Sequence, residues 1–438
     1  MAYDPYKALY LHIPFCVRRC GYCDFATSAV ERDSPIIDEY VESLVMDIRR
    51  ASREGKLGAI ETVYLGGGTP SYIGMRRLSM LLYALSMSMH LEPEVECTME
   101  ANPESLTTPM VRDIWALGVN RLSIGVQSFD DEVLRILGRA HDAEAARAAV
   151  RAAQERFENV SVDLMCGIPG QSAESFAESV REAVALGANH VSVYPLTIEP
   201  RTPFDAAIMR GEMDEPDEDV EAAAMEEARL ILEDAGFHRY EVASYARPGF
   251  ESRHNTAYWT GKPYLGLGRS AVTMTQNAER RMRVQDGQVV DDLDARQMAA
   301  EDLMLGMRMA RGVSDEQVAR AGHRRRCGEQ LGPRRLRRAV RPGPRRTRGR
   351  PLALHRRLLA LRQRALRPPP RSCPVSQPIV PASHTTTFVG GDLGRPSSTP
   401  KIFLAREGGA STAPTESFPK GRLPPVLVCR LRRDGRFH

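Results

Sequence analysis

The chain has 438 residues, of which 42% are hydrophobic, and a formal net charge of +4, so it can bury a sizeable core and hold two or three domains. Its eight cysteines are few for this length, which argues against a disulfide framework and favours a reducing, cytoplasmic location. The sequence contains neither a signal peptide nor an apolar run of about 20 residues, so we expect neither secretion nor a membrane-spanning helix.

The charge is unevenly distributed. Residues 323–438 hold 27 Lys and Arg but 5 Asp and Glu, a net of +22, whereas residues 1–322 carry a net of −18. Three interpretations of this Arg- and Pro-rich tail stay open: a disordered segment, a basic arm for nucleic acid or for peripheral membrane association, and the translation of a shifted reading frame in a GC-rich gene. We do not expect nucleic acid as a partner, and we assign no function to Cys327, Cys373 or Cys429.

Strands and helices alternate along the first part of the chain. Short apolar runs that stop at turn residues predict strands at residues 8–14, 61–65, 95–100, 121–126, 159–165 and 190–194. Helical spacing of apolar residues predicts helices at 36–52, 75–89, 107–117, 130–138, 142–157 and 172–186. This alternation indicates an α/β fold with a parallel sheet. Six units instead of eight predict a partial (β/α)6 barrel.

The later part of the chain is less regular. We predict a long acidic helix at 212–236, an irregular segment at 237–264 and a helix at 298–311. The expected division is a partial barrel in residues 1–210, an accessory region in residues 211–322, and the tail in residues 323–438.

Cys16, Cys20 and Cys23 follow the first strand with a C-x3-C-x2-C spacing. Three thiolates this close in sequence can bind one metal centre. Structural zinc needs a fourth protein ligand, for which His12 is the nearby candidate, and incidental thiols are a further alternative. A [4Fe-4S] cube held by three cysteines leaves one iron open for a small molecule, and we favour this interpretation. Tyr22 is then positioned to lie against that molecule.

Polar and glycine residues follow the next strands. After the second strand comes Gly66-Gly67-Gly68-Thr69-Pro70, whose backbone amides are expected to approach an anionic or zwitterionic ligand, aided by the N-terminus of the next helix. Taken singly, the residues at the later strand ends could be caps or surface groups. Together they suit a ligand with an amino-acid part and a ribose, because carboxylates accept ribose hydroxyls and an arginine can hold a carboxylate. They are Glu100, Gln127, Arg139 and Asp163.

These motifs resemble the radical S-adenosylmethionine (SAM) superfamily. In that superfamily three cysteines hold a [4Fe-4S] cube, and the methionyl amine and carboxylate of SAM chelate its open iron. Over residues 8–310 the chain resembles the oxygen-independent coproporphyrinogen III oxidase family, through motifs that include Tyr10-x-His12-Ile13-Pro14-Phe15-Cys16 and Arg253-His254-Asn255. The resemblance implies that SAM contacts Tyr10, Tyr22, Gly67, Gly68, Thr69, Glu100, Gln127, Arg139 and Asp163.

Two branches of this family differ near the cysteines. The oxidases, which act in porphyrin biosynthesis, carry a fourth cysteine two residues after the third, and a long N-terminal segment. Here that position is Phe25, and 15 residues precede Cys16. The resemblance therefore points to the HemW-type heme chaperones, with radical decarboxylation of coproporphyrinogen III as the alternative. Whether the chain is an enzyme stays open.

The chaperone branch implies further ligands and partners. Heme and heme-accepting apoproteins are expected, and an electron donor if the cluster is redox-active. The resemblance also implies a C-terminal domain after the barrel, which here would begin within residues 211–322 and be incomplete because the tail replaces the rest. His254 is the candidate axial ligand of heme iron, because imidazole is a common axial donor. The alternative is a loop histidine whose nitrogens are hydrogen bonded within the chain.

Overall fold

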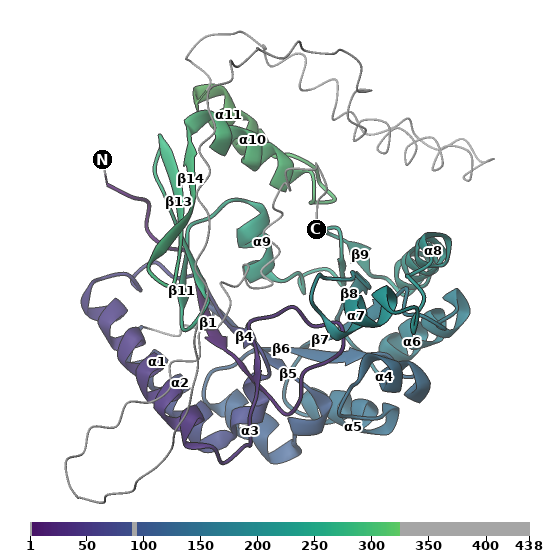
Figure 1. Ribbon diagram of the computed structural model, residues 1–438. Coiled ribbons are helices and arrows are strands. Elements are labelled where there is room, and N and C mark those ends of the chain that lie inside the picture. The colour runs from purple at the N-terminus through teal and green to yellow at the C-terminus, as the bar shows by residue number, and fades with distance from the viewer. Residues whose placement is uncertain (1, 90–93, 325–438) are drawn as a thin grey trace, which may run out of the picture. The chain divides into compact units, whose positions relative to one another are not determined.

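The computed structural model describes residues 2–89 and 94–324. Its centre is a 12-stranded sheet with the order β14-β13-β12-β11-β1-β4-β5-β6-β7-β8-β10-β9 (Figure 1). All six predicted strands are present, and neighbouring members pair in parallel. They are β1 (Ala8–Ile13), β4 (Thr62–Gly67), β5 (Glu96–Ala101), β6 (Arg121–Gln127), β7 (Asn159–Cys166) and β8 (His190–Pro195). The predicted α/β fold with a parallel sheet is confirmed.

The sheet is open in the described part of the chain. Its edge strands are β14 (Gln288–Asp294) and β9 (His238–Arg239), which do not pair with each other. This arrangement agrees with a partial barrel.

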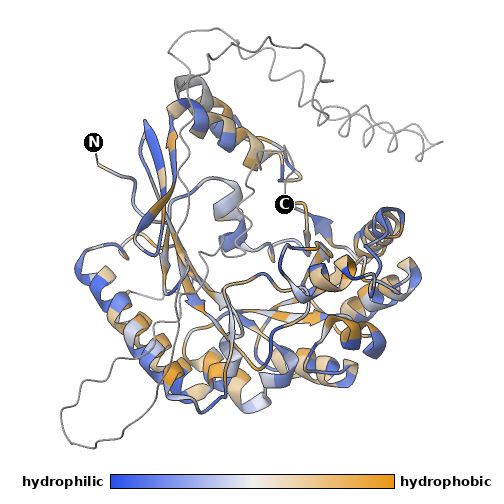
Figure 2. Cartoon of the chain, in the orientation of Figure 1, coloured by the Kyte–Doolittle hydropathy of each residue, from blue (hydrophilic) through white to orange (hydrophobic). Residues whose placement is uncertain are grey.

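Helices cover one face of the sheet (Figure 1). Leu9 and Leu11 of β1 and Val63 and Leu65 of β4 belong to the buried core that these helices share with the sheet. The helices themselves are amphipathic, and Figure 2 shows hydrophobic and hydrophilic residues along the same helix. They are α1 (Pro35–Arg53), α2 (Met75–Ser88), α3 (Thr108–Ala116), α4 (Asp131–Leu137), α5 (Ala143–Gln154), α6 (Ala173–Ala185) and α8 (Glu218–Asp234).

Helix α5 illustrates how the sequence produces these elements. The Asp142 side chain accepts a hydrogen bond from the Ala145 amide at 2.8 Å, which caps the helix. Ala146, Ala149, Val150 and Ala153 then recur at helical spacing and are buried. These small residues let the helix pack closely against the sheet.

Residues 237–264 are irregular only in part, so this prediction was wrong for the segments that form regular elements. They contain β9, β10 (Ser244–Ala246) and α9 (Arg253–Trp259). These elements are too short to give a periodic signal. Helix α9 is also stabilised from far along the chain, because the Glu96 carboxylate accepts the amides of Arg253 and His254, each at 2.9 Å. Such a long-range contact cannot be seen in the local sequence.

Several further elements lie outside the predicted set. An antiparallel group, β11 (Tyr264–Leu267), β12 (Val272–Gln276), β13 (Arg280–Gln285) and β14, extends the sheet beyond β1. The remaining ones are β2 (Phe15–Cys16), β3 (Ser28–Ala29), α7 (Pro203–Met209) and the short 3-10 helices η1 (Pro70–Ile73) and η2 (Pro103–Ser105).

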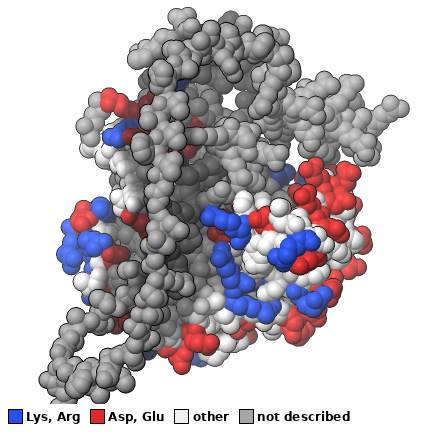
Figure 3. All heavy atoms as spheres, viewed as in Figure 1, with Lys and Arg blue, Asp and Glu red and all other residues white. Residues whose placement is uncertain are grey.

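Two predicted helices begin elsewhere than expected. Helix α8 starts at Glu218 because Asp217 caps it, and α10 (Ala295–Gly306) starts earlier than predicted because Asp294 forms a capping box with Gln297. Helix α8 is acidic, and Figure 3 shows Asp and Glu side chains gathered over it. The last described helix is α11 (Asp315–Arg324).

Strands from before and after residue 210 share one sheet, since β10 pairs with β8 and β11 pairs with β1. All described residues belong to one compact unit, and the predicted division at residue 210 stays a prediction. The interpretations of the basic tail and of an incomplete C-terminal domain concern residues that lie outside the described ranges. Within those ranges, no helix combines the length and hydropathy needed to cross a bilayer.

Candidate functional site

The face of the sheet opposite the covering helices is polar. Because side chains alternate along a strand, the residues between the apolar core positions point to this second face, which also carries α9 (Figure 1). We call it the inner face. Its members on the parallel strands include Tyr10, His12, Tyr64, Thr98, Glu100, Arg121, Ser123, Asn159, Ser161 and Asp163.

The three cysteines lie in the segment that follows β1. Cys16, Cys20 and Cys23 are free and half-buried. Burial, together with the charges of Cys23 and Cys20, raises the pKa of the Cys16 thiol to about 12, so the three sulfurs lie within electrostatic reach of one another. Burial also raises the pKa of Cys23. Thiolates in this setting need a positive partner, which iron would supply.

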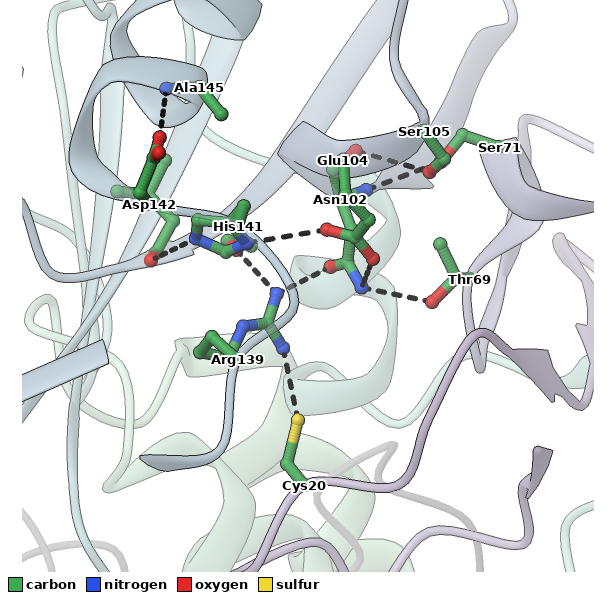
Figure 4. A network of polar contacts seen from close by, with 12 residues as sticks. Cys20, Thr69, Ser71, Asn102, Glu104, Ser105, Arg139, His141, Asp142 and Ala145 are labelled. Carbon is green, nitrogen blue, oxygen red and sulfur yellow. Dashed lines mark hydrogen bonds and ion pairs between the residues drawn. The ribbon is translucent and has the colours of Figure 1, made fainter. Parts of the chain in front are cut away.

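Two side chains donate hydrogen bonds to these sulfurs. Thr69 Oγ1 lies 3.4 Å from Cys16 Sγ, and Arg139 Nη1 lies 3.4 Å from Cys20 Sγ. Asn102 connects the two donors, since its Nδ2 donates to Thr69 Oγ1 at 3.0 Å and its Oδ1 accepts from Arg139 Nη2 at 2.8 Å (Figure 4). Donors to sulfur stabilise thiolates and tune iron–sulfur centres. The thiols and their donors therefore fit a cluster.

Asn102 was not predicted as a site residue. It follows β5 in the sequence Ala101-Asn102-Pro103, just after the strand predicted at residues 95–100. Glu104 and His141 were also missed, and they lie beside the same network at 3.3 Å from each other (Figure 4). Their signal was their position directly after a strand and in the Gly138-Arg139-x-His141 motif.

Arg139 is almost fully committed within the protein. Nη1 contacts Cys20, and Nη2 donates to Asn102 and, at 2.8 Å, to the Gly125 carbonyl. Nε is buried and has no partner among the described residues. In this conformation Nε is a group left for a ligand, and a two-point grip on a carboxylate through Nε and Nη2 would require Arg139 to give up an existing contact.

The glycine-rich loop does not offer its amides to a ligand, and this expectation was wrong. The Gly67 amide donates to Glu100 Oε2 at 2.9 Å, while the Gly68 and Thr69 amides donate to the carbonyls of Ile13 and Phe15, each at 2.8 Å. The next element is the 3-10 helix η1, whose first residue is a proline without an N–H. A ligand at this loop must therefore meet carbonyl oxygens or side chains.

Packing explains Gly67. Its φ is +111°, and a Cβ there would lie 2.4 Å from the His12 ring. The glycine permits close contact between β4 and the His12 and Tyr10 side chains of β1.

The two predicted carboxylates lie on the inner face. Glu100 accepts from the Tyr64 hydroxyl at 2.7 Å as well as from Gly67, and burial raises its pKa to about 7. Asp163 accepts from Ser123 Oγ at 2.9 Å and from Ser161 Oγ at 3.2 Å, and burial raises its pKa too. Each carboxylate retains lone pairs that could accept a ligand hydroxyl.

Gln127 has a strained backbone at the end of β6. Its φ is +66°, in the left-handed region, and the pairing with β7 shifts register between Gly125 and Gln127. Such a conformation costs on the order of 1–3 kcal/mol for a residue other than glycine and is typical of functional sites. Gln127 is 9% exposed.

His12 does not complete a zinc site. Its Nε2 lies 3.2 Å from the Ala26 carbonyl, which can only accept, so Nε2 carries the proton and Nδ1 accepts from the Tyr10 hydroxyl at 3.0 Å. Burial lowers the pKa of His12 to about 4, so the ring is neutral. Within the described ranges no three His, Cys, Asp or Glu side chains converge on a position for a single ion. In a cube each thiolate binds a different iron, so that geometry is not required.

His254 lies in α9 and not in a loop. Its Nδ1 is 2.8 Å from Thr62 Oγ1 and its Nε2 is 3.1 Å from the Tyr258 hydroxyl, and the side chain is 1% exposed. Burial, together with the charge of Arg121, lowers its pKa to about 3. Heme ligation by His254 stays a prediction, and it would require one of these two hydrogen bonds to open.

Known proteins agree with this fold and site. Residues 10–183 match the profile of the Radical SAM superfamily. The heme chaperone HemW of Synechocystis is 34% identical over 333 residues, which cover 71% of this chain and 80% of the relative. The chain belongs to the HemW family. HemW of Bacillus subtilis is 33% identical over 331 residues, which cover 72% of this chain and 86% of the relative.

A solved structure supports the fold alone. The coproporphyrinogen III oxidase HemN from Escherichia coli, a radical SAM enzyme, aligns with a TM-score of 0.59 at 23% identity, covering 69% of this chain and 76% of the HemN chain. The predicted membership of the radical SAM superfamily and of its HemW branch is confirmed. The predicted contacts to individual ligands stay predictions.

Proposed function

We propose that this member of the HemW family is a heme chaperone that binds a [4Fe-4S] cluster, SAM and heme, and transfers heme to acceptor apoproteins. The proposal is supported by the name of its relatives, which are heme chaperones, and by the three half-buried thiols after β1. Cys16, Cys20 and Cys23 would hold the cluster, which supplies an open iron for SAM and an electron if a donor protein delivers one.

The residues around the thiols would bind and orient SAM. Thr69 and Arg139 donate to the sulfurs. The Arg139 Nε, which has no partner among the described residues, would donate to the carboxylate of SAM. Glu100 and Asp163 would accept ribose hydroxyls. Tyr10, Tyr22, Gly67, Gly68 and Gln127 would complete the SAM contacts, and His254 would approach the heme iron.

The identity of residue 25, a phenylalanine, favours the chaperone function over the oxidase function. Phe25 stands two residues after Cys23, where the oxidases resembled by this chain carry their fourth cysteine, and it is 43% exposed. A phenyl ring supplies neither a thiolate ligand nor a proton donor. The alternative function, radical decarboxylation of the propionates of coproporphyrinogen III, would have to proceed without that sulfur.

The experiment uses the full chain, reconstituted anaerobically with iron and sulfide. Incubation with SAM, a reductant and coproporphyrinogen III should leave that substrate unchanged, while added heme should bind. Formation of protoporphyrinogen would refute the chaperone assignment in favour of the oxidase. A Phe25→Cys variant, together with Phe25→Ala as its control, tests whether the missing sulfur alone separates the two functions.

The location and organisation of the chain belong to the same proposal. The low number of cysteines and the exposed setting of the cluster loop suit a reducing cytoplasm, and Val17, at 44% exposure beside Cys16, could contact a protein partner. Residues 1–210 would supply the cluster and SAM site, and residues 211–322 would supply His254.

A further inference from the structure

Three neighbouring residues on the inner face have unpaired polar atoms. Thr98 of β5, Arg121 of β6 and Asn159 of β7 are direct partners across the strands, so they form a row. Thr98 Oγ1, Arg121 Nε and Asn159 Oδ1 are each buried, and none has a hydrogen-bond partner among the described residues. Unpaired buried polar groups are uncommon, and three in one row call for an explanation.

Arg121 is the centre of this row. Its side chain is 2% exposed, and no Asp or Glu of the described ranges forms an ion pair with it. The carboxyls of Glu100 and Asp163 feel the charge of Arg121 but do not contact it, and a buried guanidinium without a directly bound counter-ion is costly. The protein would avoid this cost if a ligand supplied the negative charge.

The groups that face Arg121 already have other partners. Its charge acts on Tyr64, Glu100, Asp163, His190, Tyr240 and His254. Glu100 is bonded to Tyr64 and Gly67, and Asp163 is bonded to two serines. His190 is hydrogen bonded to Ser161 and Tyr240. His254 is hydrogen bonded to Thr62 and Tyr258. None of these bonds reaches the guanidinium.

The row is separate from the cluster end of the sheet. Arg139 donates to the carbonyl of Gly125, four residues further along β6 than Arg121. At about 3.3 Å per residue, this separates the two levels by roughly 13 Å. A carboxylate at Arg121 would therefore be a different one from the carboxylate that SAM presents near the cysteines.

We propose that Arg121, with Thr98 and Asn159, binds a propionate carboxylate of heme. This inference rests on the proposed function, because heme is the proposed ligand that brings two carboxylates. Arg121 donates from Nε and Thr98 from its hydroxyl, and Asn159 can rotate its amide to donate from Nδ2. Arg121 also lies within electrostatic reach of His254, the candidate for the iron.

The test compares heme with heme dimethyl ester, whose propionates are neutral, on the reconstituted full chain. The wild type should bind heme about tenfold to a hundredfold more tightly than the ester, as expected for a hydrogen-bonded ion pair. Arg121→Met should lose this preference and bind both forms with similar affinity. Arg147→Met, which removes an arginine paired with Glu182 on the outer helices, should keep the preference.

A second variant guards against misfolding of Arg121→Met, which circular dichroism and cluster iron content would reveal. Asn159→Asp places a negative charge at the half-buried end of the row and should weaken the binding of heme more than the binding of the ester.

If the wild type binds heme and ester equally, or if both variants keep the preference, the site is refuted while the proposed function stands. If the wild type binds neither form, the proposed function fails and this inference fails with it. If both variants keep the preference for heme over the ester, buried water and not a heme carboxylate satisfies the polar atoms of Thr98, Arg121 and Asn159.

Discussion

The Tyr240 hydroxyl lies 2.9 Å from His190 Nε2, and this contact joins the sheet to the segment that leads into α9. On one side, His190 Nδ1 lies 2.8 Å from Ser161 Oγ, which also reaches Asp163. On the other side, the Tyr240 oxygen accepts the amide of Ser252, the N-cap of α9, at 3.2 Å. A continuous chain of hydrogen bonds thus runs from a predicted SAM contact to the helix that carries His254.

The partners fix the direction of every bond in this chain. The Ser252 amide must donate to Tyr240, so the Tyr240 hydroxyl proton is free to be donated to His190 Nε2. His190 Nδ1 then donates to Ser161, whose hydroxyl donates to Asp163. Burial lowers the pKa of His190 well below its usual range, in agreement with a neutral ring.

We predict that Tyr240→Phe destabilises the protein. The change leaves His190 Nε2 and the Ser252 amide unpaired in a buried setting, which costs about 1–3 kcal/mol for each lost partner. Urea unfolding of the apo chain would measure this as a lower midpoint. Tyr83→Phe is the matched control, since Tyr83 is 59% exposed, and its midpoint should stay within experimental error. Equal midpoints for the two variants would disprove a structural role of the chain of hydrogen bonds.

Removal of any one thiol of the cysteine loop should abolish the cluster. Ala at Cys16, Cys20 or Cys23 leaves two sulfurs for a cube that needs three. Iron and sulfide content after anaerobic reconstitution measures the effect. Cys97→Ala, at a buried position in the helix-facing core, should lower stability but retain the cluster iron. A cluster retained by the Cys20 variant would contradict the assignment of ligands.

Asn102→Ala should weaken SAM binding without removing a direct ligand. The variant releases both Thr69 and Arg139 from the geometry in which they reach the sulfurs. Loss of such supporting contacts commonly costs 10- to 100-fold in affinity, so we expect roughly that range for the Kd of SAM on the reconstituted protein. Asn189→Ala serves as the control, because the Asn189 side chain donates to the Glu158 carbonyl in a surface region. An unchanged Kd in Asn102→Ala would remove Asn102 from the site.

Glu100 should make the apo chain less stable as the pH rises. Burial raises its pKa to about 7 from an ordinary value of 4.5, so the folded state holds the proton more tightly than the unfolded state does. Its contribution to stability is therefore complete below about pH 4.5 and is lost as the pH rises through about 7. The full effect is at most about 3 kcal/mol.

The pH prediction is tested by comparison with a variant that does not titrate. Between pH 5 and pH 8, the free energy of unfolding of wild type minus that of Glu100→Gln should fall as the pH rises. The Gln side chain can still accept from the Tyr64 hydroxyl. A difference that stays constant over this range, or that rises, would show that Glu100 is ionised throughout.

The sequence predicted what depends on local periodicity and on motif chemistry. The six parallel strands were identifiable because each is a short apolar run that ends in turn residues, and the three cysteines because their spacing is distinctive. Residues 237–294 were harder, since β9 and β10 have two and three residues and α9 depends on Glu96, more than 150 positions away. The inner face shows the same limit, because Asn102 and Arg121 acquire their significance only from neighbours on other strands.

The direction of the glycine-loop amides was also beyond the sequence. A glycine-rich turn after a strand permits two arrangements, with amides facing a ligand or facing the protein. Here the second occurs, because Ile13 and Phe15 present their carbonyls to Gly68 and Thr69. Only the pairing of β1 with β4 decides between them.

The central claim, that this chain carries heme, is tested most directly by titrating heme into the reconstituted full chain and recording the Soret absorbance. The account predicts a saturable change that ends at one heme per chain, with heme that stays bound through gel filtration and moves to an added heme-free acceptor protein. A titration without saturation, accompanied by conversion of coproporphyrinogen III to protoporphyrinogen, would contradict it.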